Sequence, residues 1–542
     1  MKAVFVNQTG FLNKASKVAV LNFDAKEFCV KSQDGKEELR KNVTHFGTDD
    51  ISGEDTFTAD FSELEKPGKY YIEADGVKSV TFEISDNCYK KLMKDLCKCY
   101  YFLRCGTGLD EKYAGVYKHG KCHTKKAKVY GDEETVIDVT GGWHDAGDYG
   151  RYTTAGAVAV SHILYGLRFF PKLKDVEFDI PKDGNLPDIL AEVKVELDFL
   201  LKMQKEDGSA FHKVTTYNHA PFEMPEEDTE DLFLFPVSSL ATADISAVFA
   251  LASKVYEEYD ESYAKKLLEA SKKAYEWLDE HPEEVLFKNA PGSNTGEYGE
   301  AEDISNRFWA ASSLYEVTKD KKYLGDLLFQ KERLVLYETE RTRISFQGNI
   351  FTCFGWEDVA GLGSLSILLM EGEDNIKTDI TKAYSKEAER LSENAKKNGF
   401  NLCMGSEDFI WGSNMELGKY LMVLSVADLI NKEKRYEKEI QAGIDYLLGC
   451  NSMDVSYVTG NGEKAYKNPH LRPTAVDGID EPWPGLVSGG PNKGLQDERA
   501  KDVDKNSAPM KCYLDHIDCY SLNEITIYWN SPFVFVFAGL MK

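Results

Sequence analysis

Two aspartates stand three positions apart in the stretch GGWHDAGDYGRY, residues 141–152. Asp145 and Asp148 are separated only by an alanine and a glycine, and His144 directly precedes the first of them. A pair of neighbouring carboxylates can orient a water molecule and accept its proton, which is general base chemistry. A single such pair is also common in solvated surface turns. The catalytic interpretation therefore depends on what the rest of the chain supplies.

A third acidic residue stands in an unusually apolar segment near the end of the chain. Glu524 lies within CYSLNEITIYWNSPFVFVFAGL, residues 519–540, and we expect it at the start of a helix over residues 523–541. A carboxylate at a helix N-terminus interacts favourably with the helix dipole, which is a purely structural role. Apolar and aromatic surroundings instead raise the pKa of a carboxyl group and suit it to act as a general acid. The residues alone leave both roles open.

Two thiols and two imidazoles form a candidate metal site. Cys105, Cys122, His123 and His144 supply the Cys₂His₂ set that tetrahedral zinc accepts. Their spacing is not that of a zinc finger, so the alternative is that Cys105 belongs to a helix core and the others to loops. His144 would connect such a metal directly to the acidic turn.

The segment NPHLRP, residues 468–473, carries two further polar side chains. His470 and Arg472 are two positions apart, so in an extended loop they would point the same way. They are either an ordinary basic loop or a pair of donors for ligand hydroxyl groups.

The elements that must position these residues change in character near residue 86. Up to that point, short segments rich in Val, Tyr, Phe and Thr alternate with turn residues, which predicts a small all-β sandwich over residues 1–86. Residues 87–542 show helical periodicity instead, without intervening strand patterns. Twelve helices are predicted, and they favour a toroid of six helical hairpins. They cover residues 88–104, 152–170, 187–204, 240–258, 262–280, 303–318, 321–331, 356–371, 376–397, 413–431, 434–449 and 523–541.

Composition limits the classes of partner. The net charge of −26 over 542 residues opposes binding to nucleic acid or to an anionic membrane surface, and no apolar run is long enough to span a bilayer. The 11 cysteines form no regular framework, which is typical of reduced thiols. The N-terminus lacks the features of a signal peptide. We therefore expect a cytoplasmic protein, or a secreted one whose leader has been removed.

Taken together, these motifs resemble family 9 glycoside hydrolases, the inverting cellulases. The resemblance rests on GGWHDAGDYGRY, VSYVTGNG, NPHLRP, PWPGLVSGGPN and YSLNEITIYWNSP, which occur in this order. It implies a mainly α fold, in which an immunoglobulin-like β-sandwich precedes an (α/α)6 barrel. It also implies hydrolysis of β-1,4-glucosidic bonds, in cellulose-derived glucans or gluco-oligosaccharides, as an endoglucanase or a cellodextrinase.

The resemblance assigns a role to each motif. Asp148 matches the catalytic base, Asp145 the acid that helps hold the nucleophilic water, and Glu524 the general acid. His470 and Arg472 match sugar-binding residues. The Cys₂His₂ set matches a structural zinc site, which would fix the turn that carries the base. In the inverting geometry the acid and the base stand about 6.5–9.5 Å apart with a water between them.

Further positions are implied by the same resemblance. Thr474, Asp477 and the backbone carbonyl of Ile479 match a calcium site. Ser305 and Asn306 replace the adjacent acids of a second calcium site, so we do not expect that ion. Trp356 and Trp411 match two tryptophans of the cleft. Trp529 departs from the family pattern, in which a tyrosine is common at this position.

Two other functions compete with β-1,4-glucan hydrolysis. One is an exo-β-glucosaminidase on the same scaffold, which would need an acidic partner for a substrate ammonium group. The other is a non-catalytic carbohydrate-binding protein, which would have no reason to retain all three acids. The sequence does not give the oligomeric state.

Overall fold

The computed structural model of the chain describes residues 2–182, 184–340 and 348–541. These residues form two compact units, and the chain passes between them more than once. The first unit contains Met1–Cys99 and Ala388–Ile525, and the second contains Tyr100–Glu387 and Thr526–Lys542. The zinc-type residues and the aspartate pair belong to the second unit, whereas Glu524, His470 and Arg472 belong to the first.

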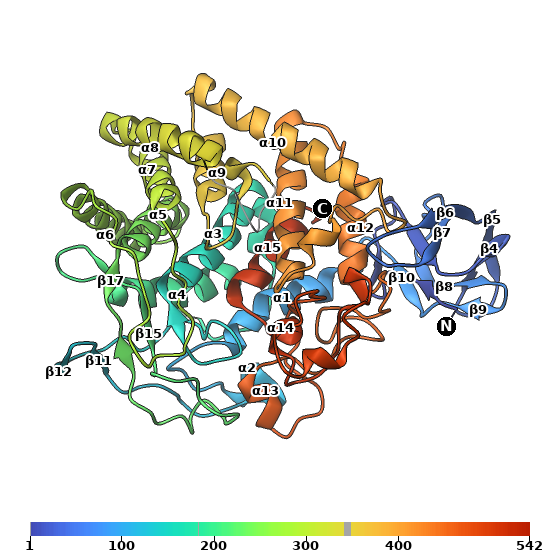
Figure 1. Cartoon of the computed structure of the whole chain (residues 1–542), viewed down its shortest axis with the longest axis horizontal. Helices are drawn as coiled ribbons and strands as arrows, with labels where there is room; N and C mark the ends of the chain where they lie inside the picture. The colour runs from blue at the N-terminus through green and yellow to red at the C-terminus, as the bar shows by residue number, and fades with distance from the viewer. Residues whose placement is uncertain (1, 183, 341–347, 542) are drawn as a thin grey trace. The chain divides into compact units, whose positions relative to one another are not determined.

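The N-terminal part of the first unit is a β-sandwich, drawn in blue in Figure 1. One sheet has the strand order β1-β3-β7-β6 and the other β2-β10-β8-β4-β5, with β9 paired to β8. Apolar side chains alternate along strands such as β8, so that one face of each sheet contributes to a shared core of Phe11, Phe61, Phe82 and Ile72. The strands are β1 (Val4–Phe5), β2 (Gly10–Phe11), β3 (Val18–Leu21), β4 (Glu27–Ser32), β5 (Glu37–Asn42), β6 (Thr44–Thr48), β7 (Asp55–Asp60), β8 (Gly68–Ala74), β9 (Val77–Lys78) and β10 (Phe82–Ile84).

The first helix, α1 (Lys90–Phe102), follows the last sandwich strand after five residues. The predicted domain boundary at residues 86 and 87 falls in this interval and stays a prediction. The other helices of the first unit are α11 (Ser413–Asn431), α12 (Glu437–Leu447), α13 (Arg472–Val476) and α14 (Tyr520–Asn523).

The second unit is built mainly from helical hairpins. Helix α5 packs against α6, α7 and α3, helix α7 packs against α8 and α9, and α3 packs against α15. Figure 1 shows α5 beside α6, and α7 beside α8. The helices are α2 (Glu111–Ala114), α3 (Thr153–Phe169), α4 (Asp188–Met203), α5 (Ser239–Tyr256), α6 (Glu261–Glu280), α7 (Ile304–Thr318), α8 (Lys321–Glu340), α9 (Ala360–Leu369) and α15 (Ile527–Ala538), while α10 (Asp374–Ala395) ends in the first unit.

The helices fall into two kinds, which explains the hairpin arrangement. In α3, α5, α7, α9 and α15 almost every residue is buried, as expected for helices covered on all sides. Helix α6 buries only one face, with Leu267, Tyr275 and Leu278 inside and charged residues outside. An enclosed helix such as α5 is therefore paired with a helix whose polar face meets solvent. The predicted all-β sandwich and helical hairpins are both confirmed.

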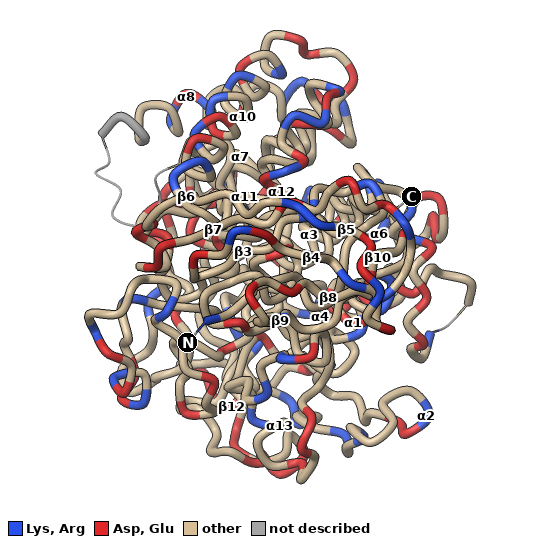
Figure 2. Tube along the Cα trace, turned by 90° about the vertical axis from the view of Figure 1, so that its right-hand side faces the viewer, with Lys and Arg blue, Asp and Glu red and all other residues tan. Residues whose placement is uncertain are grey.

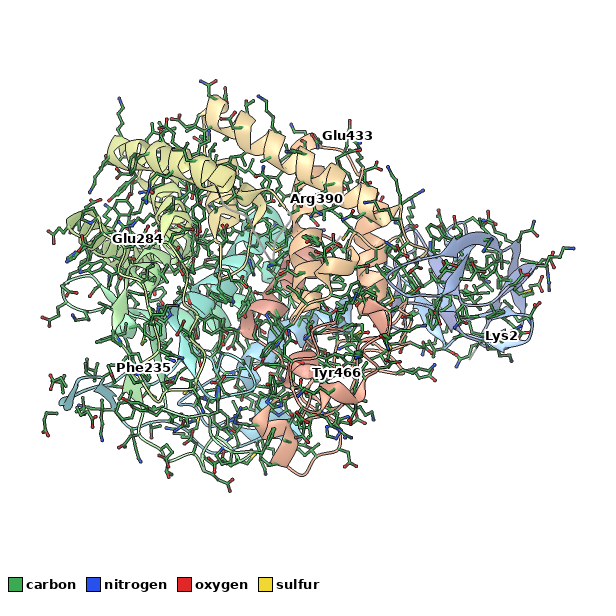
Figure 3. All side chains as sticks on the ribbon, viewed as in Figure 1. Lys2, Phe235, Glu284, Arg390, Glu433 and Tyr466 are labelled. Atoms are coloured by element: carbon green, nitrogen blue, oxygen red, sulfur yellow. The ribbon has the colours of Figure 1, made fainter. Side chains whose placement is uncertain are left out.

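The absence of strands after residue 86 was a wrong prediction. A five-stranded sheet of order β12-β11-β16-β15-β13 lies in the second unit, and a further pair joins β14 to β17. Phe235, labelled in Figure 3, directly follows β16 and stacks on Tyr130 with ring centroids 5.8 Å apart. The strands are too short for a clear alternating pattern. They are β11 (Ala127–Val129), β12 (Asp132–Ile137), β13 (Arg151–Tyr152), β14 (Ala210–Phe211), β15 (Lys213–Thr215), β16 (Phe233–Leu234) and β17 (Val237–Ser238).

The predicted start of the last helix was also wrong. Helix α15 begins at Ile527, because the Thr526 side chain accepts a hydrogen bond from the backbone N–H of Trp529 and so caps the helix. Glu524 lies in extended backbone between α14 and α15, with φ −59° and ψ 148°. Glu524 is therefore not the N-cap residue of α15, which is Thr526.

Among the described residues, no helix combines the length and the apolarity needed to cross a bilayer. Figure 2 shows Lys and Arg interspersed with Asp and Glu along the trace, so the net charge of −26 does not come from one acidic segment.

Candidate active site and metal centre

The turn that carries the two aspartates is fixed through its backbone. The Asp145 N–H donates to the Gly150 carbonyl at 2.9 Å, and the Asp145 carbonyl accepts from the Ile527 N–H at 2.8 Å. His144 donates its own N–H to the Leu103 carbonyl at 2.7 Å. The turn is thus attached both to the residue that follows α1 and to the start of α15.

Helix α4 holds the same turn from another side. Glu196 accepts from the Trp143 backbone N–H at 2.7 Å, and Glu192 accepts from the Trp143 indole N–H at 2.9 Å. Glu192 also pairs with the buried Arg104, which donates from its Nη2 at 2.7 Å. A side chain at Gly142 would place its Cβ 2.7 Å from the Phe199 ring, so a glycine is required there.

Asp145 is almost completely buried. Burial raises the pKa of its carboxyl group well above the usual value, while the charge of Asp148 raises that pKa further. Tyr298 opposes this effect, because its hydroxyl donates to Asp145 Oδ2 at 2.5 Å. The other oxygen, Oδ1, is buried and has no hydrogen-bond partner among the described residues. Asp145 therefore presents one unused acceptor.

Two hydrogen-bond donors contact one oxygen of Asp148. Its Oδ2 accepts from the Gly150 N–H at 3.2 Å and from the Tyr152 hydroxyl at 3.1 Å. The ring nitrogen Nδ1 of His219 lies 3.3 Å from the same oxygen. The Asp148 side chain is 9% exposed, so it reaches solvent where Asp145 does not.

Aromatic rings surround the hydroxyl that holds Asp145. The ring of Tyr298 lies 4.7 Å from that of Tyr152, 5.0 Å from that of Trp356 and 6.0 Å from that of Tyr528. Trp356 is half-buried and meets Tyr298 edge to face. The structure therefore places one predicted tryptophan one ring away from the aspartate pair. Trp529 is buried in α15.

The predicted residues of the first unit form a second group. His470 and Glu524 lie opposite each other in a parallel β-bridge, and the His470 N–H donates to the Asn523 carbonyl at 2.9 Å. The Glu524 carbonyl accepts from the Gly489 N–H at 2.9 Å. Trp411 is 37% exposed, and its ring lies 5.3 Å from that of Tyr520.

His470 has a defined tautomer. Its Nδ1 lies 2.6 Å from the Ile517 carbonyl, which only accepts, so Nδ1 carries the proton. Burial lowers the pKa of this imidazole, so the ring is neutral and Nε2 is an acceptor. Arg472 is the first residue of α13 and is buried, and Leu471 before it is extended, so the prediction that His470 and Arg472 point the same way stays a prediction.

The four predicted metal ligands come together in the second unit. One ligand atom from each of Cys105, Cys122, His123 and His144 lies within 4.8 Å of the other three, and all four residues are buried. His123 Nε2 lies 3.2 Å from the carboxylate of Asp228, while its Nδ1 is buried without a partner among the described residues. A ligating histidine whose other nitrogen is held by a carboxylate is the usual arrangement at metal centres. The residues therefore fit a metal ion.

The predicted calcium ligands stand at the end of α13. Asp477 Oδ1 accepts from the Ile479 N–H at 2.9 Å, and Thr474 donates its hydroxyl to the Leu471 carbonyl at 3.0 Å. Asp477 Oδ2 is buried and has no partner among the described residues, and burial raises the pKa of this carboxyl group. An unpaired carboxylate oxygen on a loop fits a hard cation.

Ser305 and Asn306 lie at the start of α7. We expect no second calcium ion at this position. The Asn306 amide donates to Asp244 Oδ1 at 3.0 Å and to Glu300 Oε1 at 3.4 Å. Burial raises the pKa of Asp244 to about 8. The absence of an ion here stays a prediction.

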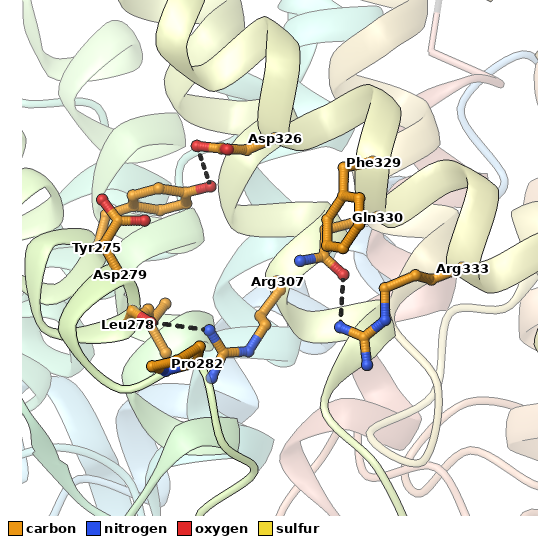
Figure 4. A pocket seen from close by; sticks show the side chains of 9 residues that line it. All are labelled: Tyr275, Leu278, Asp279, Pro282, Arg307, Asp326, Phe329, Gln330 and Arg333. Carbon is orange, nitrogen blue, oxygen red and sulfur yellow. Dashed lines mark hydrogen bonds between the residues drawn. The ribbon is translucent and has the colours of Figure 1, made fainter.

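A cavity of about 180 Å³ between α6, α7 and α8 is shown in Figure 4. It contains none of the predicted site residues. Its Arg307 already donates to the Leu278 carbonyl at 3.0 Å and to Asp303 at 2.9 Å. The residues that line this cavity are therefore different from those of the candidate active site.

The fold and the paired carboxylates together define a glycoside hydrolase with a helical catalytic domain and an immunoglobulin-like N-terminal domain. A model of glycosyl hydrolase family 9 matches residues 89–537, and one of the cellulase N-terminal ig-like domain matches residues 1–79. The chain therefore belongs to glycosyl hydrolase family 9.

Relatives of known activity and structure agree with this assignment. A cellodextrinase of Butyrivibrio fibrisolvens is 63% identical over 100% of both chains. The structure of a thermostable endoglucanase of Alicyclobacillus acidocaldarius, solved as a single mutant, matches this chain with a TM-score of 0.92. The two sequences are 33% identical, and the match covers 100% of both chains. The family 9 endoglucanase J30, solved as a zinc-binding triple mutant, has a TM-score of 0.90 at 29% identity, over 98% of this chain and 99% of that one.

The structure adds residues that the sequence pattern did not indicate. Tyr298 holds Asp145 from 153 residues away, and His219 and Asp228 approach Asp148 and His123 from a loop between β15 and β16. No local spacing signals such pairs, because the chain brings them together only after folding.

We predict that Tyr298→Phe lowers kcat roughly 10-fold or more, because a hydrogen bond to an ionised carboxylate is lost. Since Tyr298 lowers the pKa of Asp145, its loss raises that pKa, and the acid limb of the activity profile moves to higher pH. The measurement is kcat/KM against pH on a soluble cello-oligosaccharide.

Tyr275→Phe is the matched control, because the Tyr275 hydroxyl also donates to a partly buried aspartate, Asp326, at 3.0 Å, but at the cavity of Figure 4. An unchanged pH profile in Tyr298→Phe would contradict the role given to the Tyr298 hydroxyl.

Proposed function

We propose that the protein hydrolyses β-1,4-glucosidic bonds in cellulose-derived glucans with inversion at the anomeric carbon. The observation that carries this proposal is the buried aspartate pair, in which Asp145 keeps one oxygen unpartnered while Tyr298 holds the other. Asp148 is the general base, and Asp145 orients the same water molecule through its unused oxygen. The two acids cannot serve as acid and base for each other, because an inverting enzyme needs its acid on the opposite side of the scissile bond.

Glu524 is the proposed general acid. It is half-buried, and its backbone is held in extended form by the Gly489 N–H and by the bridge with His470. It precedes Ile527, whose N–H binds the Asp145 carbonyl, by three residues.

The proposed sugar-binding residues have chemistry that suits pyranose rings. Trp411 exposes an aromatic face on which a sugar ring can stack, and Trp356 stands beside Tyr298. The neutral ring of His470 is fixed by its Nδ1 proton, which is donated to the Ile517 carbonyl. Arg472 supplies donors from the start of α13.

We predict that Asp148→Asn and Glu524→Gln each reduce kcat at least about 10²–10⁴-fold, the usual contribution of proton transfer, with little change in melting temperature. The assay is release of reducing ends from cellotetraose. Asp132→Asn, an amide exchange on the exposed strand β12, is the control and should remain active. Near wild-type rates in either of the two catalytic variants would refute the assignment of roles.

Zinc is the metal that we propose for the Cys₂His₂ cluster. Two thiolates and two imidazoles in a closed, buried set are characteristic of structural zinc. The ion would bind Cys105, Cys122, His123 and His144, and it would supply a rigid cross-link between the loops that carry them. Because His144 directly precedes Asp145, such a cross-link holds the base-bearing turn in place.

We predict about one zinc per chain, lost in Cys122→Ser together with several degrees of melting temperature and most of the activity. Elemental analysis, calorimetry and the cellotetraose assay measure the three effects. Cys99→Ser is the control, because the Cys99 thiol donates to the Leu96 carbonyl at 3.1 Å and a serine hydroxyl can make the same contact. Unchanged activity and melting temperature in a zinc-free Cys122→Ser protein would break the proposed coupling.

Calcium is proposed for the end of α13, with Thr474, Asp477 and the Ile479 carbonyl as ligands. The support is the buried, unpartnered Oδ2 of Asp477. The ion would fix the loop that follows His470 and Arg472.

Short soluble substrates are proposed in preference to insoluble cellulose. None of the described cysteines forms a disulfide, and all of them are buried. This suits a reducing compartment such as the cytoplasm, where imported cellodextrins are the accessible substrate. The 63% identical cellodextrinase supports the same preference. An endoglucanase acting on soluble glucan is the second candidate, because the structurally similar proteins include endoglucanases.

We predict a higher kcat/KM on cellotetraose than on carboxymethylcellulose, with the viscosity of the polymer falling only in proportion to the reducing ends released. The measurement pairs a reducing-end assay with viscometry on the same reaction. A rapid fall in viscosity with few reducing ends released would identify an open-cleft endoglucanase and overturn the cellodextrinase proposal.

A further inference from the structure

A cavity of about 290 Å³ lies within the first unit, between the β-sandwich and the helical part of that unit. One wall of this sandwich cavity comes from β3, β6 and β7, and the other comes from α12 and residues 395–401. None of its lining residues belongs to the candidate active site or to a candidate metal site. Its volume is near the lower end of the range for small-molecule sites.

Two buried side chains of α12, one helical turn apart, line the sandwich cavity. Asp445 is 5% exposed and Gln441 is 4% exposed. Asp445 Oδ1 accepts from the side-chain amides of Asn7 and Gln441, each at 2.8 Å. The same two amides donate to the Tyr89 hydroxyl, at 3.1 and 3.0 Å. This network fixes the carboxyl group of Asp445 and the amide of Gln441 in one orientation.

The network leaves two acceptor atoms unused. Both donors to Asp445 contact Oδ1, so Oδ2 receives no hydrogen bond from the described residues. Gln441 Nε2 donates to Asp445 and to Tyr89, which uses both of its protons and leaves Oε1 as the remaining polar atom of that amide. A buried acceptor without a donor is costly, so a ligand that fits these two atoms supplies hydrogen-bond donors.

The charges around the sandwich cavity favour neutral donors over a cation. Burial raises the pKa of Asp445 to about 7, so its negative charge is incomplete at neutral pH. The buried ammonium group of Lys17, which donates to three backbone carbonyls, opposes that rise with its own positive charge. The exposed part of the lining contains two lysines, Lys396 and Lys438, and one acid, Asp60. A cationic ligand would meet three positive charges, whereas hydroxyl groups would not.

Two phenylalanines add apolar surface to the lining. Phe46 of β6 is 41% exposed, and Phe400 is buried. A pyranose ring presents hydroxyl groups around its edge and C–H groups on its faces. Fixed acceptors beside an aromatic ring suit both of these features.

We propose that the sandwich cavity is a binding site for a small neutral sugar of one or two pyranose rings. Hydroxyl groups of the sugar donate to Asp445 Oδ2 and Gln441 Oε1, and a ring face packs on Phe46. Because the two walls come from the β-sandwich and from the helical part, a bound sugar joins them and stabilises the first unit. Glucose and cellobiose belong to this class of ligand.

The test is hydrogen–deuterium exchange of the full chain, with glucose or cellobiose added at millimolar concentrations. We expect slower exchange in peptides that cover residues 395–401 and 438–450, together with a melting temperature that rises with sugar concentration. Ethanolamine, a small ammonium ion with a hydroxyl group, should have neither effect. The measurement involves no turnover, so its result does not depend on the proposed hydrolysis.

Two variants place the effect in the sandwich cavity. Phe46→Ala should raise the Kd for the sugar about fivefold, because the aromatic face is lost. Asp445→Asn should raise it about 10-fold, because a charged acceptor is replaced by an amide. Phe329→Ala is the control, because Phe329 is an exposed phenylalanine of α8 in the second unit, and it should match wild type.

Three outcomes would overturn the inference. Unchanged exchange of both peptides in the wild type with either sugar would show that the cavity binds no such ligand. Protection that persists with an unchanged Kd in Phe46→Ala would show that the sugar acts from another site, and this result stands even if Asp445→Asn does not fold. Protection by ethanolamine but not by the sugars would identify a site for cations.

Discussion

The geometry of the candidate active site depends on the backbone of Asp145. Its N–H and its carbonyl are both hydrogen-bonded, to Gly150 within the turn and to Ile527 at the start of α15. Backbone hydrogen bonds of this kind are not open to competition from solvent once buried, so they fix the direction of the side chains on either side. The side chains of Asp145 and Asp148 therefore leave the turn in defined directions and form the acidic pair. The side chain of His144 leaves it toward the candidate metal cluster.

Burial changes the protonation equilibrium of the Asp145 carboxyl group, and it also makes the charged form less stable. The carboxyl group of Asp145 is dehydrated, which raises its pKa, and the neighbouring charge of Asp148 adds to the effect. Tyr298 offsets part of this through its short hydrogen bond. Glu196 on α4 shows the same balance, because burial raises its pKa to about 8 while the Trp143 N–H lowers it. The turn is thus surrounded by acidic groups that the fold keeps close together only through many directed donors.

The parts of this arrangement that are local or repeated could be predicted from the sequence. The helices emerged from their 3.6-residue periodicity, and α11 was predicted with the bounds Ser413–Asn431 that the structure gives. The four candidate metal ligands could be singled out because few residue types bind zinc and because they resemble a family pattern. Helix α15 was placed too early, because apolar residues begin before the Thr526 cap. The donors that orient the acids carry no such signal: Tyr298 has a backbone φ of 48° and meets Asp145 only in the folded chain. His219 and Asp228 lie in the loop between β15 and β16, and they approach Asp148 and His123 only in the folded chain. The two strands are too short to show a sequence pattern that would predict this.

In the proposed mechanism, the two aspartates direct a water molecule at the anomeric carbon from the side opposite the leaving group. The most direct measurement is proton NMR of the products during the first minutes of cellotetraose hydrolysis, before mutarotation equilibrates them. If Asp145 and Asp148 act in this way, the new reducing end appears first as the α-anomer. An initial β-anomer would mean a double displacement through a covalent intermediate, and it would contradict the roles assigned to Asp145 and Asp148.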